Sequence, residues 1–506
     1  MSRELELAQK KQDELASIIK NSNEIQNQRP LFHFATPGGW CNDPNGFSQF
    51  DDKIHLFYQY NPYSTKWGSI HWGHVISKDM LDWELQPVAL APENEGDCKG
   101  CFSGTAIDDN GCHLMAYTGV SNNGKVDIQN QCIAAGDGIH YQKKSEKAII
   151  TAEDIPFKYN NEHFRDPKLW KKDGVYYMAC VIKQLNDCGA LILFESQDSK
   201  TWKYKGMLDS SKDGLSKMWE CPDLLNLDGK DMMILSPQEM KEDYQLGFHN
   251  GNNSLYITGT LDYENVKFTR EVRPENGYTA AQIDYGIDFY APETTKLKDG
   301  RTILIAWMQS WESYITPENY IWSGMMTIPR ELSFKNNRLY QNPVRELEKW
   351  KVGQIQGNAE KNEIKVFETQ PRHFELDLVL DFETDGYVEL FLGNDKTESV
   401  SLRFDLSEKS ILFDRSKSLT PGAVSFRKAK LEPEGKKMNV RILCDTCSLE
   451  VFADDGKIAF TNSFFFTDSN SPFELRNQTS GSVAYSYWKI KKECKIKSLK
   501  ENQNDE

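Results

Sequence analysis

A turn followed directly by an apolar strand recurs five times in the first two thirds of the sequence. The turns are rich in Asp, Asn and Gly, and the runs that follow them are residues 54–60, 112–118, 175–181, 231–237 and 302–308. Successive turns are about 55 to 70 residues apart. Repetition at such a period is typical of sheets arranged radially, which leaves few exposed strand edges. The pattern therefore predicts a β-propeller with five blades.

A second pattern follows the same repeat. Asp79 is followed four residues later by Trp83, and Asp198 is followed at the same distance by Trp202. An ordinary β-sandwich would also contain Asp-Gly turns, so the turns alone leave that alternative open. The coincidence of both patterns favours the propeller.

Changes in periodicity divide the chain into segments. Apolar residues recur at helical spacing over residues 3–21, whereas stretches such as 373–382 and 399–406 alternate apolar and polar residues, as half-buried strands do. We therefore predict an all-β protein with a short N-terminal helix, in which a five-bladed propeller is followed by a β-sandwich. The predicted segments are a helical extension (1–29), the propeller (30–345), a linker (346–360), the sandwich (361–495) and a polar tail (496–506).

Composition excludes several classes of partner and site. The chain has 60 basic and 75 acidic residues and a net charge of −15, which argues against binding to nucleic acid. It lacks an apolar run long enough for a transmembrane helix, so we expect no membrane partner. The charged N-terminus and the odd number of cysteines, 11, favour a cytoplasmic location. The two Cys-x-x-Cys pairs are far apart in the sequence, and we expect no metal and no cofactor.

Three carboxylates occupy similar positions in the repeat. Asp43, Asp166 and Glu220 each precede one of the Asp/Gly turns by about seven to nine residues. Each has a plain structural explanation when taken singly, since Asp43 begins an Asp-Pro-Asn-Gly sequence that suits a type I turn. Their equivalent placement at the start of inner strands, which converge on a propeller axis, favours a shared catalytic role instead.

Eight segments together resemble the motif set of glycoside hydrolase family 32, which contains invertases, sucrose-6-phosphate hydrolases, inulinases and levanases. They are HFATPGGWCNDPNG (33–46), LFYQYNP (56–62), WGSIHWGH (67–74), GCFSG (100–104), FRDPK (164–168), WECPD (219–223), DFYAPET (288–294) and WSGMMTIPREL (322–332). The resemblance covers residues 30–347 and continues weakly at CSLEVFADDG (447–456). The fold of that family, a five-bladed propeller followed by a β-sandwich, agrees with the repeat.

The resemblance implies a role for each carboxylate. Asp43 is expected to be the nucleophile, Glu220 the general acid and then base, and Asp166 the transition-state stabiliser held by Arg165. Such a pair of carboxylates suits a retaining mechanism through a covalent intermediate. We expect the apolar neighbours of Glu220 and the nearby carboxylates to favour its neutral form, and Arg165 to keep Asp166 ionised.

The resemblance also implies a set of residues around a fructosyl ring. Amides and hydroxyls would bind the sugar hydroxyls, while aromatic faces would cover the apolar side of the ring. The expected substrate-binding residues are Trp40, Asn42, Gln59, Trp67, Phe102, Ser103, Arg165 and Trp322. We expect His71 and His74 to be structural.

Two positions depart from the family pattern without removing a catalytic group. Cys41 stands where many members have a larger apolar residue. Glu293 stands where Gln is frequent, and it could pair with Arg330 or influence acceptor binding.

The sequence thus predicts a β-fructofuranosidase that hydrolyses sucrose or sucrose 6-phosphate. A hydrolase of short fructans or a fructosyltransferase is the alternative enzyme, and a non-catalytic sugar-binding propeller is the remote alternative. The expected partner is a small sugar, and the oligomeric state stays open.

Overall fold

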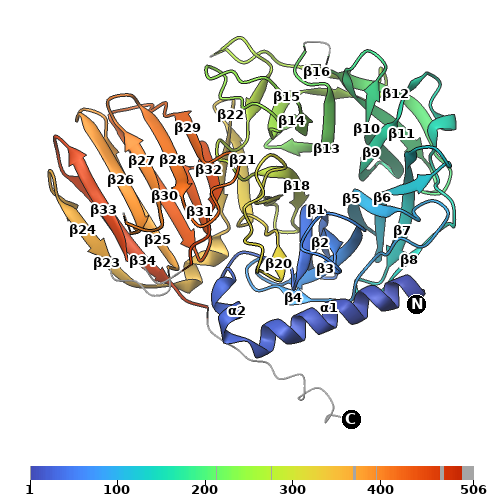
Figure 1. Cartoon of the computed structure of the whole chain (residues 1–506). Coiled ribbons are helices and arrows are strands. Elements are labelled where there is room, and N and C mark those ends of the chain that lie inside the picture. Colours follow the sequence, from blue (N-terminus) through green and yellow to red (C-terminus); the bar gives the residue numbers. More distant parts are fainter. Residues whose placement is uncertain are drawn as a thin grey trace.

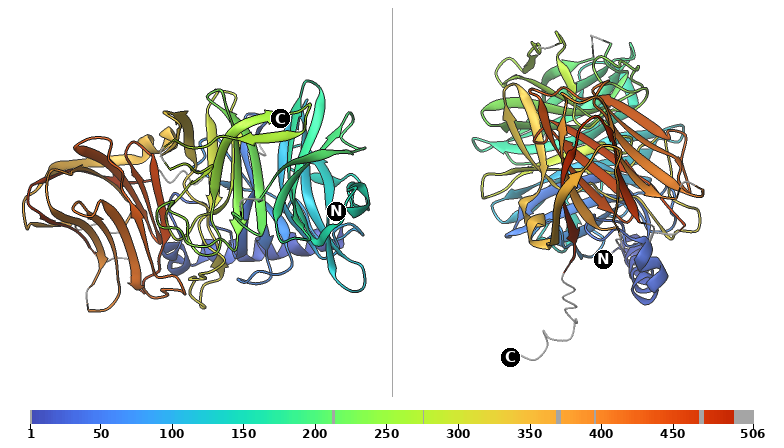
Figure 2. Two further views of the ribbon diagram at one scale, coloured as in Figure 1. Left: turned by 90° about the horizontal axis from the view of Figure 1, so that it is seen from above. Right: turned by 90° about the vertical axis from the view of Figure 1, so that its left-hand side faces the viewer.

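A computed structural model describes residues 2–211, 214–274, 276–367, 372–394, 396–467 and 472–492. Two β domains lie side by side, and helices at the N-terminus run along one side of the larger domain (Figure 1). The view from above shows the two domains as adjoining bodies (Figure 2). The predicted tail, 496–506, lies outside the described residues.

The larger domain contains five sheets in chain order, antiparallel throughout except that β20 pairs parallel to β1. The first is formed by β1 (Gly39–Phe50), β2 (Lys53–Asn61), β3 (His71–Ser77) and β4 (Glu84–Leu85), with β20 (Trp322–Ser323) added beside β1. The second is formed by β5 (Gly100–Asp109), β6 (Cys112–Asn122), β7 (Asp127–Gly136) and β8 (Tyr141–Lys143). The third is formed by β9 (Tyr159–Lys172), β10 (Val175–Gln184), β11 (Gly189–Ser196) and β12 (Lys203–Ser210), after the short helix η1 (Ala152–Asp154).

The last two sheets complete the domain. The fourth contains β13 (Met218–Leu227), β14 (Lys230–Gln238), β15 (Leu255–Asp262), β16 (Lys267–Arg270) and β17 (Ala280–Gln282). The fifth contains β18 (Tyr290–Lys296), β19 (Thr302–Trp307), β21 (Arg330–Lys335) and β22 (Arg338–Pro343). The five predicted strands therefore fall in five different sheets, as β2, β6, β10, β14 and β19.

The first strands of the five sheets form a closed ring. Each of β1, β5, β9, β13 and β18 contacts the next, and β18 contacts β1 again. This arrangement makes the domain a propeller whose innermost strands surround the axis (Figure 1). The predicted turns lie at the far ends of these strands, where Asp52, Asp173 and Asp228 have positive φ angles. Asn and Asp tolerate this left-handed conformation better than most residues.

The smaller domain is a sandwich of two six-stranded sheets. One sheet has the order β23-β34-β25-β30-β31-β32 and the other β24-β33-β26-β27-β28-β29. Alternate apolar side chains of both sheets form its core. The strands are β23 (Lys351–Ala359), β24 (Ile364–Phe367), β25 (Phe374–Asp381), β26 (Gly386–Gly393), β27 (Ser399–Asp405), β28 (Ser410–Lys417), β29 (Phe426–Lys430), β30 (Lys437–Asp445), β31 (Ser448–Ala453), β32 (Ile458–Ser463), β33 (Phe473–Thr479) and β34 (Val483–Ile490).

The predicted linker, 346–360, is wrong in its extent. Its first residues belong to the short helix η2 (Arg345–Trp350), and residues 351–359 form β23 of the sandwich. The mostly polar sequence of this strand hid it, because β23 is an edge strand whose outer residues are exposed.

The N-terminal helix α1 (Arg3–Asn21) matches its predicted range and is followed by α2 (Asn23–Gln28). Its buried face contains Ala8, Gln12 and Leu15. The Gln12 side chain donates a hydrogen bond to the carbonyl oxygen of Gln86, 3.0 Å away, which fixes α1 against the first blade. None of the described helices is both long and apolar enough to cross a membrane.

Candidate active site

A β-bulge interrupts every innermost strand. The pairing registers shift between Cys41 and Pro44 in β1 and between Phe102 and Gly104 in β5, and β9, β13 and β18 show the same irregularity. A bulge turns side chains out of the regular alternation of the strand. In four of the strands a proline follows, and the two residues before it are Asn42-Asp43, Arg165-Asp166, Glu220-Cys221 and Tyr290-Ala291.

The backbone is strained at three of these bulges. Asp166, Cys221 and Ala291, each the residue before the proline, have φ angles of 58°, 44° and 50°. A residue other than glycine in this region costs about 1–3 kcal/mol, and such residues cluster at functional sites. The strain therefore lies at the bulges of β9, β13 and β18.

Asp43 lies in a network of polar side chains from two blades. Its Oδ2 accepts a hydrogen bond of 2.6 Å from the Ser103 hydroxyl, and its Oδ1 accepts one of 3.1 Å from the Asn42 amide. Gln59 contacts Ser103 and also donates to Asp43, at 3.5 Å. These contacts fix the carboxylate in one orientation, and the structure brings together the four residues that the sequence predicted here.

Cys221, the residue after Glu220, contacts both Asp166 and Asp43. Its backbone N–H donates a hydrogen bond of 2.9 Å to Oδ2 of Asp166. Its Sγ lies 3.6 Å from Oδ2 of Asp43 and 3.8 Å from Oδ2 of Asp166. Asp43, Asp166 and the residue after Glu220 therefore meet at one point, as their positions in the repeat predicted.

Glu220 is held by three side chains. Oε1 accepts two hydrogen bonds from Arg165, at 2.9 and 3.1 Å. Oε2 accepts hydrogen bonds from the Tyr290 hydroxyl at 2.6 Å and from the Gln238 amide at 2.7 Å. Sequence reasoning missed Tyr290 and Gln238, although the Ala291-Pro292 step repeats the Asp43-Pro44 and Asp166-Pro167 steps and could have indicated Tyr290.

The contacts of Arg165 differ from the prediction. Both of its hydrogen bonds to a carboxylate go to Glu220, whereas its Nε lies 3.8 Å from Asp166. Burial raises the pKa of Asp166 to about 7, with Arg165 opposing this shift and Glu220 adding to it. Arg165 therefore lowers the pKa of Asp166 in the expected direction, but its hydrogen bonds go to Glu220 in the next blade and the pKa of Asp166 stays raised.

The pKa of Asp43 is also raised, to about 6. Burial is the largest cause, and the hydrogen bond from Ser103 opposes it. Removal from water penalises the charged form of a carboxyl group, while hydrogen-bond donors favour it. Perturbed carboxyl groups that converge in this way are typical of catalytic sites.

Aromatic residues border the carboxylates on two sides. Trp67 is 49% exposed and meets Phe102 edge to face at 5.9 Å between ring centroids. On the other side, Trp40 donates a hydrogen bond to Asn42 and packs against Tyr314, which is half exposed. The exposed faces of Trp67 and Tyr314 suit the apolar side of a sugar ring, whereas Trp40 is 1% exposed and supports Asn42 and Tyr314 from the core. Tyr314 was not found from the sequence.

Trp322 does not belong to this group. It is 1% exposed and packs with Tyr320 and Phe465, and Arg29 lies over its ring at 5.3 Å. Its strand β20 pairs with the very start of β1, so the indole lies between the propeller and the sandwich rather than at the carboxylates. The prediction that Trp322 covers the sugar ring is therefore wrong.

The two unusual positions have structural roles. Glu293 does not pair with Arg330, because Arg330 binds Asp284 and Glu450. The Glu293 carboxylate instead accepts a hydrogen bond from the backbone N–H of Phe47, and burial raises its pKa well above the usual range. Cys41 is fully buried in the core of the first blade.

The predicted structural histidines lie away from the carboxylates. His74 is buried and contacts His55 at 3.0 Å, and His71 contacts the carbonyl oxygen of Ser69 at 3.0 Å. Within the described ranges, no group of three or more His, Cys, Asp and Glu side chains has a geometry that could hold a metal ion.

Comparison with known proteins agrees with this geometry. Residues 33–343 match the model of the glycosyl hydrolases family 32 N-terminal domain, and residues 339–492 match the family 32 C-terminal model. The sucrose-6-phosphate hydrolase of Escherichia coli is 34% identical over 463 residues, which cover 86% of this chain and 89% of that protein. A raffinose invertase of Escherichia coli is 33% identical over 473 residues, or 92% of this chain and 94% of the relative.

Solved structures give the same result for the fold. The Bombyx mori GH32 beta-fructofuranosidase BmSUC1 superposes with a TM-score of 0.84 at 29% identity, covering 96% of this chain and 99% of the other. Both domains are thus accounted for by one family. The chain is a member of glycoside hydrolase family 32.

Proposed function

We propose that this protein is a retaining β-fructofuranosidase that acts on sucrose or sucrose 6-phosphate. The observation that carries the proposal is the meeting of Asp43, Asp166 and the Glu220-Cys221 bulge at the propeller axis. The names of the two Escherichia coli relatives support a substrate with a terminal fructosyl unit. Cytoplasmic location stays a prediction from the sequence.

In the first step, an Asp43 oxygen attacks the anomeric C2 of the fructosyl unit. The bond from C2 to the bridging oxygen breaks, and Glu220 gives its proton to that oxygen as the glucose half leaves. Asp166 hydrogen-bonds fructose hydroxyls and stabilises the positive charge that develops on the ring. The product of this step is a fructosyl ester of Asp43.

In the second step, water attacks C2 of the ester and gives a proton to Glu220. The C2–Asp43 bond breaks, which releases fructose with retained configuration and restores both carboxyl groups to their starting states. The Ser103 and Asn42 hydrogen bonds favour the charged carboxylate that leaves in this step.

The Glu220→Ala variant tests this assignment. Fluoride needs little help from an acid, so we expect hydrolysis of sucrose to fall far more than the release of fluoride from β-fructosyl fluoride. Loss of the base also makes the ester accumulate, and azide, which needs no deprotonation, should then yield β-fructosyl azide. A Glu195→Ala variant, which removes a partly exposed glutamate paired with Lys205, is the control.

Two results would overturn the assignment. An azide product of inverted configuration would show that Asp43 is a general base that activates water and not a nucleophile. Equal losses on fluoride and sucrose without azide rescue would reduce Glu220 to a binding residue. Comparison of kcat/KM for sucrose, sucrose 6-phosphate and 1-kestose then separates the substrate classes, with a tenfold preference corresponding to about 1.4 kcal/mol.

A further inference from the structure

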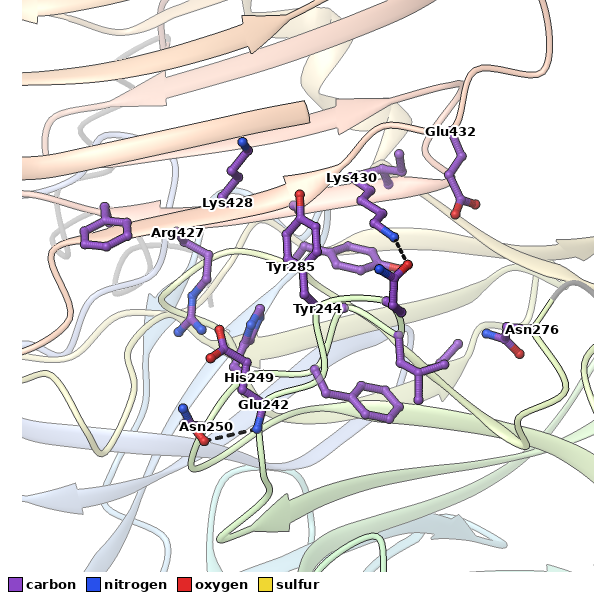
Figure 3. Close-up of a pocket in the computed structure, with 18 of the residues that line it drawn as sticks. Glu242, Tyr244, His249, Asn250, Asn276, Tyr285, Arg427, Lys428, Lys430 and Glu432 are labelled. Carbon is purple, nitrogen blue, oxygen red and sulfur yellow. Dashed lines mark hydrogen bonds between the residues drawn. The ribbon is translucent and has the colours of Figure 1, made fainter. Parts of the chain in front are cut away.

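A cavity lies between the propeller and the sandwich, separate from the three carboxylates. The propeller loop 242–250 and Tyr285 line one side, and β29, the edge strand of a sandwich sheet, lines the other (Figure 3). Its volume is about 650 Å³, which is within the range of small-molecule sites. None of the three catalytic carboxylates lines it.

The lining is basic although the whole chain carries a net charge of −15. Ion pairs account for three of the cations, because Arg338 contacts Glu432, and Lys428 and Lys457 contact glutamates outside the cavity. The lining contains two glutamates, Glu242 and Glu432, against six cationic residues: Arg273, Arg338, Arg427, Lys428, Lys430 and Lys457.

Arg427 is a partly buried cation of this lining that has no ion pair within the described ranges. Its Nε is buried, and within the part of the chain that the structure describes no hydrogen bond or ion pair reaches its guanidinium. Burial lowers its pKa to about 10, since the nearby acids Asp288 and Glu312 offset the loss of water only in part. Leaving a charge buried and unpaired is costly. A planar guanidinium in this state is suited to bind an oxyanion through two parallel hydrogen bonds.

His249 supplies a second polar group in the same place. It is 7% exposed, and its Nε2 is buried without a hydrogen-bond partner among the described residues. Burial and the charge of Arg427 lower its pKa well below the usual range, so the imidazole is neutral. Figure 3 shows His249 below Arg427, next to Glu242 and Asn250. A neutral imidazole can donate one N–H to a bound anion.

The mouth of the cavity carries aromatic rings. Tyr244 is 44% exposed and Phe426 is 62% exposed. Lys430 lies over the Tyr244 ring at 5.2 Å and hydrogen-bonds the neutral side chain of Gln245. Exposed rings beside amides and a cation suit a ligand with an apolar face and many hydroxyls, and a sugar ring has both.

We propose that this cavity binds a small phosphorylated sugar, with Arg427 and His249 holding the phosphate and Tyr244 and Phe426 contacting the sugar. Such binding is separate from catalysis at the propeller axis and does not rest on the proposed function. Glu242, which is exposed at the same cavity, would repel the phosphate, so its charge gives a test of opposite sign.

Calorimetric titration of the full chain tests the site, with glucose 6-phosphate as the probe and glucose and inorganic phosphate as comparisons. We expect glucose 6-phosphate to bind more tightly than phosphate and glucose to show no binding. Arg427→Gln should weaken glucose 6-phosphate at least tenfold, and Glu242→Gln should tighten it. Arg403→Gln removes an arginine of the same sheet that is paired with Glu389, and it should change nothing.

Thermal unfolding without ligand separates a binding role from a structural one. Because Arg427 has no partner, Arg427→Gln should leave the Tm unchanged or raise it, and sucrose hydrolysis should stay at the wild-type level. A lower Tm of Arg427→Gln would show that Arg427 also has a structural role. Arg427→Lys, which keeps the charge but not the planar guanidinium, then becomes the test. The proposal requires that this variant also binds glucose 6-phosphate more weakly. Undiminished binding in Arg427→Gln would place the phosphate elsewhere and overturn the proposal. Equal affinity for phosphate and glucose 6-phosphate would overturn its sugar part.

Discussion

The Tyr290 hydroxyl lies 2.6 Å from Oε2 of Glu220, and the two residues belong to adjacent blades. The same hydroxyl lies 3.1 Å from the carbonyl oxygen of Ser236. Glu220 lies in the fourth blade and is held from both sides, by Arg165 of the third blade and Tyr290 of the fifth. Glu220, which we propose as the general acid, is therefore oriented by parts of the propeller that are far from it in sequence.

We expect Tyr290→Phe to lower kcat/KM for sucrose about 10- to 100-fold. A hydrogen bond to a charged group contributes about 1.5–3 kcal/mol, and the phenyl ring keeps the packing. Because Tyr290 acts through Glu220, the first step with β-fructosyl fluoride should be affected much less. Tyr176→Phe removes a similar tyrosine–carboxylate contact, with Asp109, and should leave kcat/KM unchanged. Equal losses on both substrates would show that Tyr290 does not act through the acid.

The pH dependence of kcat/KM should report the state of Asp43. The nucleophile must be ionised, and its raised pKa is about 6. We therefore expect kcat/KM to decline as the pH falls below about 6, and the protonation of Asp166, whose pKa is about 7, to begin the decline at slightly higher pH. Rates measured from pH 4 to 8 on sucrose give this acid limb directly.

Ser103→Ala should move that acid limb to higher pH. The Ser103 hydroxyl favours the charged form of Asp43, so its removal raises the pKa, by about one unit for a charge-assisted hydrogen bond. The variant should lose more activity at pH 5 than at pH 8. Ser48 lies in β1, the strand that carries Asp43, and its hydroxyl contacts His113 instead. Ser48→Ala should therefore leave the acid limb in place. An unmoved limb in Ser103→Ala would mean that another group controls it.

Asp43→Asn should remove nearly all turnover and leave the fold intact. The amide keeps the shape of the side chain and can still accept the Ser103 hydrogen bond, but it cannot form the ester. Retention of more than about one per cent of kcat/KM, a loss below about 2.7 kcal/mol, would contradict the nucleophile assignment. Asp51→Asn, in an exposed turn of the same blade, is the matched control.

Local patterns were sufficient to predict most of the fold. The turns at Asp173 and Asp228 and the apolar strands after them are set by residues close in sequence. The strand 351–359 was predicted as a linker, because an edge strand of mostly polar residues lacks the apolar alternation on which the prediction relied. Trp322 was misplaced for a related reason, since a buried indole looks alike in a core and at a sugar site until its neighbours are known.

The sequence predicted the three carboxylates of the site but not the hydrogen bonds between blades that hold them. Asp43, Asp166 and Glu220 were found because they precede equivalent turns. The partners of Arg165 depend on the rotation of adjacent blades and on the bulges, which no local pattern specifies. The proline that follows four of the five bulges was the available signal, and it marks Tyr290 as well as the three carboxylates.

Arg330 is one of the buried links between the two domains. It lies on β21 of the propeller and binds Glu450 and Thr461 of the sandwich as well as Asp284. Its side chain and the carboxylates of Asp284 and Glu450 are fully buried. Glu450 also contacts His33 at 2.7 Å. The motifs around residues 322–332 and 447–456 therefore meet at the domain interface, which explains why the resemblance continues into the sandwich.

We expect Arg330→Met to destabilise the protein by about 3–5 kcal/mol, because it leaves the buried Asp284 carboxylate without its cation and leaves Glu450 with His33 alone. Arg345→Met removes an arginine that is 68% exposed and paired with Glu331, and it should cost at most about 1 kcal/mol. Urea unfolding followed by tryptophan fluorescence compares the two variants with the wild type. The difference should be smaller in acid, where protonation of the freed carboxylates relieves their burial. Equal effects of the two substitutions would show that the buried cluster does not hold the domains together more strongly than a surface pair.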